Sequence, residues 1–203
     1  MRIALALIAL GGLVAGCGDD TTSPAGLDMS VPHDLATGGS APTCAAYCAK
    51  IQMNCTGGDA GGNEQYASES GCNSYCGSAG WGVGMIGDTS GNTIGCRLYH
   101  AGAAAADPVL HCPHAGPTGG AVCGSLCENY CQLMAKNCTG ANAVYDAATC
   151  TSKCAMLGTQ GHANDTTGNT VQCRIYYLGL AATDPTACAN AFQVADKATT
   201  LCQ

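Results

Sequence analysis

Apolar side chains and cysteines recur along the chain at the spacing of an α-helix, in two stretches that match each other. Positions at i, i+4, i+7 and i+11 share one helix face, and in the first stretch they are Cys44, Cys48, Ile51 and Cys55. In the second stretch the same face is formed by Cys127, Cys131, Met134 and Cys138. Each stretch therefore predicts a helix whose buried face consists mainly of cysteines.

Two further helices are predicted in each stretch. The second helix carries two cysteines four residues apart, which are Cys72 and Cys76 in the first stretch and Cys150 and Cys154 in the second. The third begins at an Asn-Thr pair, at positions 92–93 or 169–170, because these side chains suit a helix N-cap. It ends before an Asp-Pro pair, because the residue ahead of proline is disfavoured in the helical region. No segment keeps the apolar–polar alternation of a strand. The predicted fold class is therefore all-α, with about three helices in each stretch.

Sixteen of the 17 cysteines form two sets of eight with closely similar spacing. The steps between successive cysteines are 4, 7, 17, 4, 20, 16 and 11 in the first set, and 4, 7, 12, 4, 19, 15 and 14 in the second. Short motifs recur beside them, such as Asp-Thr-Ser-Gly-Asn-Thr at 88–93 and Asp-Thr-Thr-Gly-Asn-Thr at 165–170. The agreement indicates a tandem duplication, which places module 1 at residues 43–123 and module 2 at residues 124–203.

The cysteines compensate for a poor hydrophobic core. The 203 residues include one Phe and one Trp, and only 10% are charged, so large apolar side chains are scarce. Small modules bury little surface to begin with, and a disulfide typically contributes about 2–4 kcal/mol. Eight bridges would therefore stabilise the fold, provided that the protein resides in an oxidising compartment.

The two Cys-x-x-x-Cys helices of each module predict crosswise bridges if they face each other antiparallel. In this respect alone they are similar to the twin-motif chaperones of the mitochondrial intermembrane space. Sequence does not select among the many other pairings that eight cysteines allow, so the remaining pairs are hypotheses. The expected pairs of module 1 are Cys44–Cys76, Cys48–Cys72, Cys55–Cys96 and Cys112–Cys123. Those of module 2 are Cys127–Cys154, Cys131–Cys150, Cys138–Cys173 and Cys188–Cys202.

The amino terminus has the form of an export signal. Arg2 precedes an apolar run from Ile3 to Val14, and small residues lead to the seventeenth cysteine, Cys17. The run is too short for a transmembrane helix, which needs about 20 apolar residues. The stretch Leu-Val-Ala-Gly-Cys at 13–17 resembles the lipobox of bacterial lipoproteins. The alternative is an ordinary secretory signal in which the cysteine stands by chance.

The lipobox resemblance implies a particular organisation and location. Residues 1–16 would be a signal peptide, and Cys17 would carry a diacylglycerol thioether and an acylated amino group. Residues 17–42 would be the lipidated cysteine and a flexible tether, because Gly, Ser, Thr, Pro and Asp dominate there. We therefore expect a protein lipid-anchored in the cell envelope, in the outer membrane of a Gram-negative bacterium.

The charge of the chain narrows the choice of partners. Seven Lys and Arg stand against 14 Asp and Glu, for a net charge of −7, and no basic stripe is present. Nucleic acid is therefore not an expected partner. The expected partners are membrane lipid, through Cys17, and an unidentified protein or surface.

Three histidines of module 1 form the most specific candidate site. They lie within 15 residues and are His100, His111 and His114. Neutral imidazoles are good ligands for zinc and copper. Module 2 has Tyr177 at the position of His100 and no histidine near Cys188. The alternative is that His100, four residues after Cys96, packs against the bridge region without binding a metal.

Two further features allow a functional and a structural interpretation. Trp81, the only tryptophan, stands in a glycine-rich segment at 77–91; it is a candidate binding contact if exposed, or a plug of the small core if buried. Arg97 and Arg174 occupy matching positions. They would bind an anion or, as we expect, pair with an acidic side chain or lie on a solvated helix face.

These observations favour a lipid-anchored structural or binding module of the cell envelope, without enzymatic activity and without a cofactor. The alternative is a metal-binding or metal-dependent protein that uses the histidines of module 1, with zinc or copper as the metal.

Overall fold

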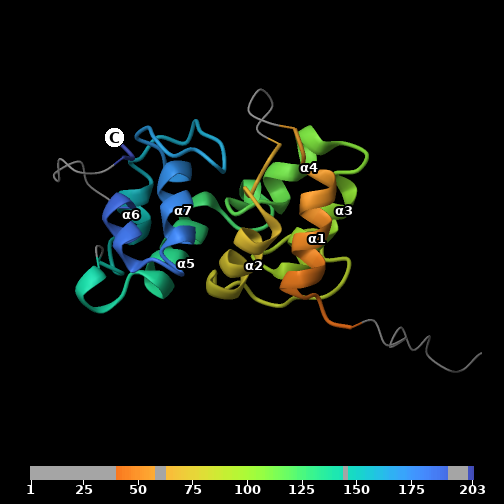
Figure 1. Cartoon of the computed structure of the whole chain (residues 1–203), viewed down its shortest axis with the longest axis horizontal. Coiled ribbons are helices and arrows are strands. Elements are labelled where there is room, and N and C mark those ends of the chain that lie inside the picture. The colour runs from red at the N-terminus through yellow and green to blue at the C-terminus, as the bar shows by residue number, and fades with distance from the viewer. Residues whose placement is uncertain (1–39, 58–62, 144–145, 192–200) are drawn as a thin grey trace, which may run out of the picture. The chain divides into compact units, whose positions relative to one another are not determined.

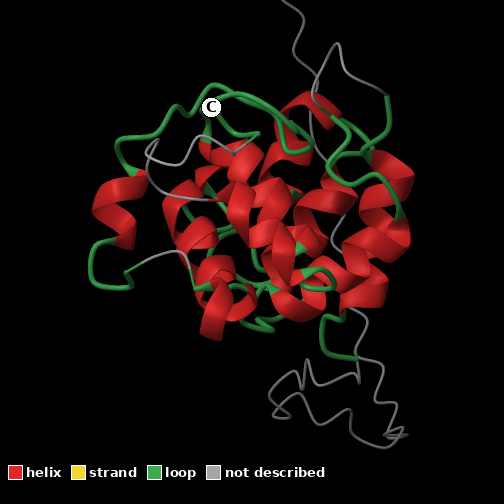
Figure 2. Cartoon of the chain, turned by 60° about the vertical axis from the view of Figure 1, so that its left-hand side comes forward, coloured by secondary structure: helices red, strands yellow, loops and turns green. Residues whose placement is uncertain are grey.

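The computed structural model describes residues 40–57, 63–143, 146–191 and 201–203. Residues 39–203 form one compact unit. Within the described ranges the chain consists of helices and loops without a strand, as Figure 2 shows, so the all-α prediction is confirmed. Cys17, the predicted signal peptide and nearly all of the predicted tether lie outside the described residues.

Each module contains three α-helices followed by a fourth helical element, with one short 3₁₀ helix placed differently in the two modules (Figure 1). The elements of module 1 are α1 (Cys44–Asn54), α2 (Glu69–Ser78), α3 (Ile94–Ala103), α4 (Pro108–Ala115) and the short 3₁₀ helix η1 (Gly119–Ala121). The elements of module 2 are α5 (Leu126–Asn137), η2 (Gly140–Asn142), α6 (Cys150–Cys154), α7 (Val171–Leu180) and η3 (Pro185–Ala191). None of the described helices is long and apolar enough to cross a membrane.

Local sequence sets the start of the third helix in both modules. The Thr93 side chain accepts a hydrogen bond from the backbone N–H of Cys96 at 3.0 Å, which caps α3. The Thr170 side chain caps α7 in the same way, at 3.2 Å from the N–H of Cys173. The predicted N-caps are therefore confirmed.

The Asp-Pro pair of module 1 begins a helix that the sequence analysis did not predict. The Asp107 side chain accepts a hydrogen bond from the N–H of Leu110 at 3.1 Å, and Pro108 is the first residue of α4. Proline suits this position because a helix leaves its first N–H groups without intrahelical partners. The equivalent segment of module 2 forms the 3₁₀ helix η3, so each module has a fourth helical element.

Four disulfides join the Cys-x-x-x-Cys helices crosswise, which is the arrangement that equal spacing on antiparallel helices predicts. The bridges are Cys44–Cys76, Cys48–Cys72, Cys127–Cys154 and Cys131–Cys150. They attach α2 to α1 and α6 to α5.

The other four expected pairs are wrong. Where Cys55–Cys96, Cys112–Cys123, Cys138–Cys173 and Cys188–Cys202 were expected, the bridges are Cys55–Cys112, Cys96–Cys123, Cys138–Cys188 and Cys173–Cys202. The reason is the unpredicted fourth element. It carries Cys112 or Cys188 to the end of the first helix, which leaves the cysteine of the third helix to pair with the last cysteine of its module.

The two modules share their core contacts as well as their bridges. Tyr47 of α1 donates its hydroxyl hydrogen to the carbonyl of Ala115 at 2.7 Å, and Tyr130 of α5 donates to Ala191 at 2.8 Å. Both tyrosines are fully buried. A buried hydroxyl needs a partner, so each module ties its first helix to its fourth element by the same hydrogen bond.

Candidate metal centre

The structure brings the three histidines of module 1 together. His100 comes from α3, and His111 and His114 come from α4. One ring nitrogen of each lies within 4.8 Å of the others. The ring centroid of His100 lies 5.2 Å from that of His111 and 4.9 Å from that of His114. Because α4 was not predicted, the sequence suggested the set by proximity alone, and the packing of α4 against α3 brings the rings together.

The hydrogen bonds of His100 determine which of its nitrogens is available. Its Nε2 lies 3.1 Å from the backbone carbonyl of Thr89. A carbonyl only accepts, so Nε2 carries the hydrogen and Nδ1 of the neutral ring keeps its lone pair. This Nδ1 lies 2.9 Å from Nδ1 of His111, which therefore donates to it. A backbone carbonyl that orients the distal N–H is the usual outer contact of a metal-bound histidine.

His114 presents a nitrogen that the protein itself does not satisfy. Its Nδ1 is buried and has no hydrogen-bond partner among the described residues. Gly120 of η1, at φ +51°, leaves room for this ring, since a Cβ there would lie 2.6 Å from Cδ2 of His114 and 3.0 Å from its backbone nitrogen. A buried, unpaired nitrogen costs about 1–3 kcal/mol, and a ligand that it could coordinate would remove that cost.

Burial keeps two of the imidazoles neutral. Desolvation, together with the neighbouring histidines, lowers the pKa of His114. Desolvation also lowers the pKa of His100, and the hydrogen bond to Thr89 opposes this shift only in part. Metal ions bind the neutral imidazole, so both shifts preserve coordinating ability below the usual pKa of histidine.

The spacing of the nitrogens fits a small transition metal ion. Zinc–nitrogen bonds of about 2.0–2.1 Å place tetrahedral ligand atoms about 3.3 Å apart. The 2.9 Å separation of the His100 and His111 Nδ1 atoms lies just below this value, and the 4.8 Å limit for the three ligand atoms lies above it. The separations therefore bracket the value that a tetrahedral site requires.

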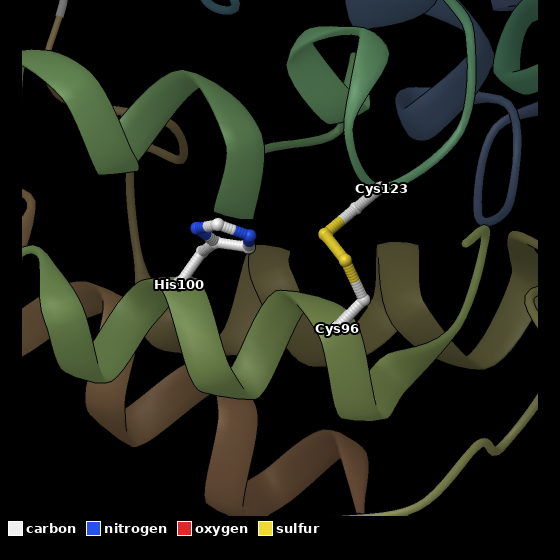
Figure 3. Close-up of side chains that lie close together, drawn as sticks. All are labelled: Cys96, His100 and Cys123. Atoms are coloured by element: carbon white, nitrogen blue, oxygen red, sulfur yellow. A yellow bond between two sulfur atoms is a disulfide. The ribbon is translucent and has the colours of Figure 1, made fainter. Parts of the chain in front are cut away.

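A second group near His100 is not a metal site in this structure. Cys96 and Cys123 lie close to His100, and Figure 3 shows the imidazole and the Cys96 side chain on the same side of α3. The two sulfurs form a disulfide. The metal-binding form of cysteine is the thiolate, so the candidate ligands are the three histidines alone.

Module 2 keeps the hydrogen bond of His100 but not the site. Tyr177, at the position of His100, donates its hydroxyl hydrogen to the carbonyl of Thr166 at 3.1 Å. Thr166 is the counterpart of Thr89 in the repeated motif. The positions of His111 and His114 hold Ala187 and Asn190. The helix-to-loop hydrogen bond is therefore common to both modules, and the converging nitrogens belong to module 1.

Trp81 is not an exposed contact, which corrects the functional interpretation of this residue. It is 7% exposed, and its ring lies 6.0 Å from that of Tyr47 and 5.5 Å from that of Tyr75. Its Nε1 donates to Oδ1 of Asn129 at 2.9 Å. The module buries Trp81 because it offers few other large side chains with which to fill its core.

Arg97 lies inside the core, which the sequence analysis did not predict. The side chain is fully buried, with Cζ 3.6 Å from the centroid of the Trp81 ring. It donates to Oδ1 of Asn129 at 2.8 Å and to the carbonyl of Thr93 at 3.2 Å. Burial lowers its pKa, and the surrounding tyrosines oppose the shift. A cation–π contact and hydrogen bonds take the place of the expected surface ion pair.

Comparison with known proteins finds a family match over module 1. Residues 40–125 match the BfoA family C-terminal domain. Over 76 residues the chain is 40% identical to "Aurasperone B biosynthesis cluster protein A" of Aspergillus niger, and 38% identical to "Bifonsecin B biosynthesis cluster protein A" of Aspergillus brasiliensis. The aligned residues are 37% of this chain but only 23–24% of those relatives. The chain therefore spans about a quarter of the length of the curated relatives it matches. No solved structure matches the chain.

These relatives overturn the expected location. They are Aspergillus proteins and point to a fungal protein, whereas a Gram-negative outer membrane occurs only in bacteria. The interpretation as a lipid-anchored protein of that membrane is wrong. The comparisons give no support to the lipobox resemblance at residues 13–17, and Cys17 itself lies outside the described residues. The names of these relatives describe cluster proteins and state no reaction.

Proposed function

We propose that the protein is a disulfide-stabilised binding module that holds one divalent transition metal ion, Zn²⁺ or Cu²⁺, through His100, His111 and His114. The convergence of their ring nitrogens within 4.8 Å carries the proposal. The ion would take the place of the proton now shared between the Nδ1 atoms of His100 and His111. His111 would then carry its hydrogen on Nε2, and both Nδ1 lone pairs would face the metal.

The scaffold supports this role by limiting the movement of the ligands. Cys96–Cys123 ties α3 to the end of module 1, and Cys55–Cys112 ties α4 to α1. A site held by cross-linked elements loses little entropy on binding. Because the two cysteines near His100 are joined in a disulfide, they are not available as thiolate ligands, and the histidines are the ligands left for a metal ion. We assign no reaction to the metal, and the absence of enzymatic activity stays a prediction.

Titration of the full-length protein with zinc against a chromogenic chelator tests the proposal. We expect one bound Zn²⁺ per chain. His100→Tyr is the informative variant, because Tyr177 shows that a tyrosine keeps the hydrogen bond to the loop carbonyl. This variant should fold normally and lose at least 10-fold in zinc affinity. His111→Ala and His114→Ala should lose affinity as well.

His162→Ala is the matched control, because His162 is exposed and belongs to module 2. It should bind zinc as the wild type does. If His100→Tyr and His111→Ala retained wild-type affinity for both zinc and copper, the three histidines would be packing residues and the proposal would fail.

A further inference from the structure

One disulfide lies beside the candidate metal centre. The two sulfurs of Cys96–Cys123 and one ring nitrogen of His100 all lie within 4.8 Å of one another. Figure 3 shows the imidazole and the bridge next to each other on the same side of α3. Within the described ranges, no other bridge forms a group of this kind with a histidine or an acidic side chain. The sulfurs of this bridge are therefore the ones that could join a nitrogen ligand if the bridge opened.

The segment that carries Cys123 has a strained backbone. Ala121 has φ +62°, and in the part of the chain that the structure describes it is the only residue other than glycine with a positive φ. The left-handed conformation costs an L-residue about 1–2 kcal/mol, and it persists only where the surrounding structure enforces it. The bridge from Cys123 to α3 is one such constraint. Opening of the bridge would therefore allow Ala121 to relax and Cys123 to move.

A small movement of Cys123 would bring the two sulfurs to the spacing of a metal site. Bonded sulfurs are about 2 Å apart. Zinc–sulfur bonds of about 2.3 Å place two tetrahedral thiolates about 3.8 Å apart, so the sulfurs need to separate by about 2 Å. Cys96 and His100 stay one helical turn apart on the same face of α3. Only the ligand on the loop therefore has to move.

The same segment also contacts the histidine site. Gly120, next to Ala121, lies against the ring of His114. Ala121 is exposed and Val122 is half-buried, whereas Cys123 itself is buried. A reductant therefore reaches the bridge when this segment opens locally, and the same opening removes the contact that supports the His114 ring. Residues 120–123 thus couple the state of the bridge to the state of the histidine site.

We propose that Cys96–Cys123 is a redox switch of the metal centre. A dithiol reductant attacks one sulfur, passes through a mixed disulfide and leaves as a cyclic disulfide, so that two electrons and two protons convert the bridge into two thiols. A Zn²⁺ ion then displaces both thiol protons to the solvent and is bound by the two thiolates and His100.

The switch changes the ligands from three nitrogens to two sulfurs and one nitrogen, which favours softer ions such as Cd²⁺. As a switch it rests on the proposed function. The thiolate site itself requires His100 but neither His111 nor His114.

Stepwise reduction of the full-length protein in oxygen-free buffer tests the proposal. A water-soluble phosphine is the reductant, because it is oxidised to the phosphine oxide and adds no thiol ligand of its own. Alkylation and peptide mass mapping identify the bridges that have opened, and circular dichroism follows the helices. Co²⁺ is the probe, because thiolate ligands give it a charge-transfer band in the near ultraviolet. The band should appear in step with the opening of Cys96–Cys123, and the reduced protein should bind Cd²⁺ about 10-fold or more tightly than the oxidised protein does.

Two variants and one internal control separate the sulfurs from the histidine. Replacement of both Cys96 and Cys123 by serine should abolish the band, and His100→Tyr should weaken the binding of Co²⁺ to the reduced protein about 10-fold. The matching bridge of module 2, Cys173–Cys202, should open without producing a band.

Three results would overturn the proposal: no band with the bridge open and the helices intact, an unchanged band in the serine variant, or opening of the bridge only after the helices are lost. The zinc titration of the oxidised protein tests the three-histidine site separately. Failure of that titration together with a cobalt band after reduction would refute the three-histidine site alone, and the reverse would refute the switch alone.

Discussion

The two modules have the same bridges and the same cap on the third helix, yet only module 1 gathers three histidines. In module 1 the ring of His100 bonds to the carbonyl of Thr89, and in module 2 Tyr177 bonds to that of Thr166. That hydrogen bond is thus part of the shared scaffold. The difference lies on the fourth element, where module 1 has His111 and His114 and module 2 has Ala187 and Asn190 at the equivalent positions. The scaffold of both modules therefore positions a ring beside the loop. The residues that face this ring from the fourth element decide whether it can take part in a metal site.

A second difference concerns the buried cation. Arg97 lies against Trp81 and bonds to Asn129 of module 2. Arg174, at the matching position, bonds to Asn169 and Thr170 of its own module. Leu157 takes the position of Trp81 and is only partly buried. The packed centre of module 1, formed by Trp81 and Arg97, is therefore larger than that of module 2, and it includes Asn129 of module 2.

The largest effect should come from this packed centre. Trp81→Ala should lower the free energy of unfolding by about 3–5 kcal/mol, because it leaves a cavity and removes the ring that faces the Arg97 guanidinium. Leu157→Ala should cost about 1–2 kcal/mol, because a half-buried side chain removes less apolar surface from water. Urea unfolding measures both. Equal losses would contradict the asymmetry. Met85→Ala is the control, since Met85 is 72% exposed and should change stability by less than about 0.5 kcal/mol.

Removal of the equivalent bridges should separate stability from metal binding. Cys96–Cys123 and Cys173–Cys202 span 27 and 29 residues, so replacing either pair by serine should cost a similar amount, about 2–4 kcal/mol. Only the first replacement should weaken zinc binding, because Cys96 holds the helix that carries His100. Thermal unfolding and the zinc titration measure the two effects. A loss of zinc affinity from the module 2 replacement would show that the site depends on the whole unit and not on module 1.

Removal of the metal should lower the free energy of unfolding by an amount that depends on how fully the site is occupied. At a free zinc concentration 100-fold above Kd, a ligand that binds only the folded state adds about 2.7 kcal/mol to the free energy of unfolding. Chelation should remove that stabilisation from the wild type and should have a smaller effect on His100→Tyr, smaller by about 1.3 kcal/mol if the variant binds zinc 10-fold more weakly. Urea unfolding with and without chelator measures this. An equal response of the two proteins would place the metal elsewhere.

The smallest effect should be a pH dependence of the metal-free protein. The pKa values of His100 and His114 are lowered from 6.5 in the folded state, so the unfolded chain binds more protons as the pH falls below about 6.5. The stability that the neutral rings contribute is present above that pH and is lost as the pH falls through the lowered values. His100→Tyr should flatten the dependence between pH 7.5 and pH 5. An unchanged slope in unfolding experiments would contradict the assigned burial of His100.

The sequence allowed the helices and half of the bridges to be predicted, for local reasons. The caps at Thr93 and Thr170 need only contacts three residues apart, and the Cys-x-x-x-Cys pairs share a helix face by periodicity. The fourth element was missed because an Asp-Pro pair was taken only as a helix end, although proline also favours the first helical position. That omission led to the four wrong pairings, since Cys112 was assigned to its neighbour along the chain.

The sequence predicted which residues form the candidate metal centre, but it did not predict how they are arranged. Three histidines within 15 residues are visible in the sequence, but their convergence depends on α4 packing against α3. The interior position of Arg97 had no sequence signal, because a lone arginine after a cysteine is usually solvated. The contact between the modules had no sequence signal either, since it joins segments about 100 residues apart, such as Glu64 and Asn164.

The sequence by itself determined the helical class, the duplication and the identity of the histidines, because these depend on periodicity, repetition and composition, which are properties of the chain. The tertiary structure alone decided which cysteines of the third and fourth elements meet, that Trp81 and Arg97 are buried, and that His100, His111 and His114 face one another. These depend on how distant elements pack, and packing selects one arrangement among many that the same local pattern allows.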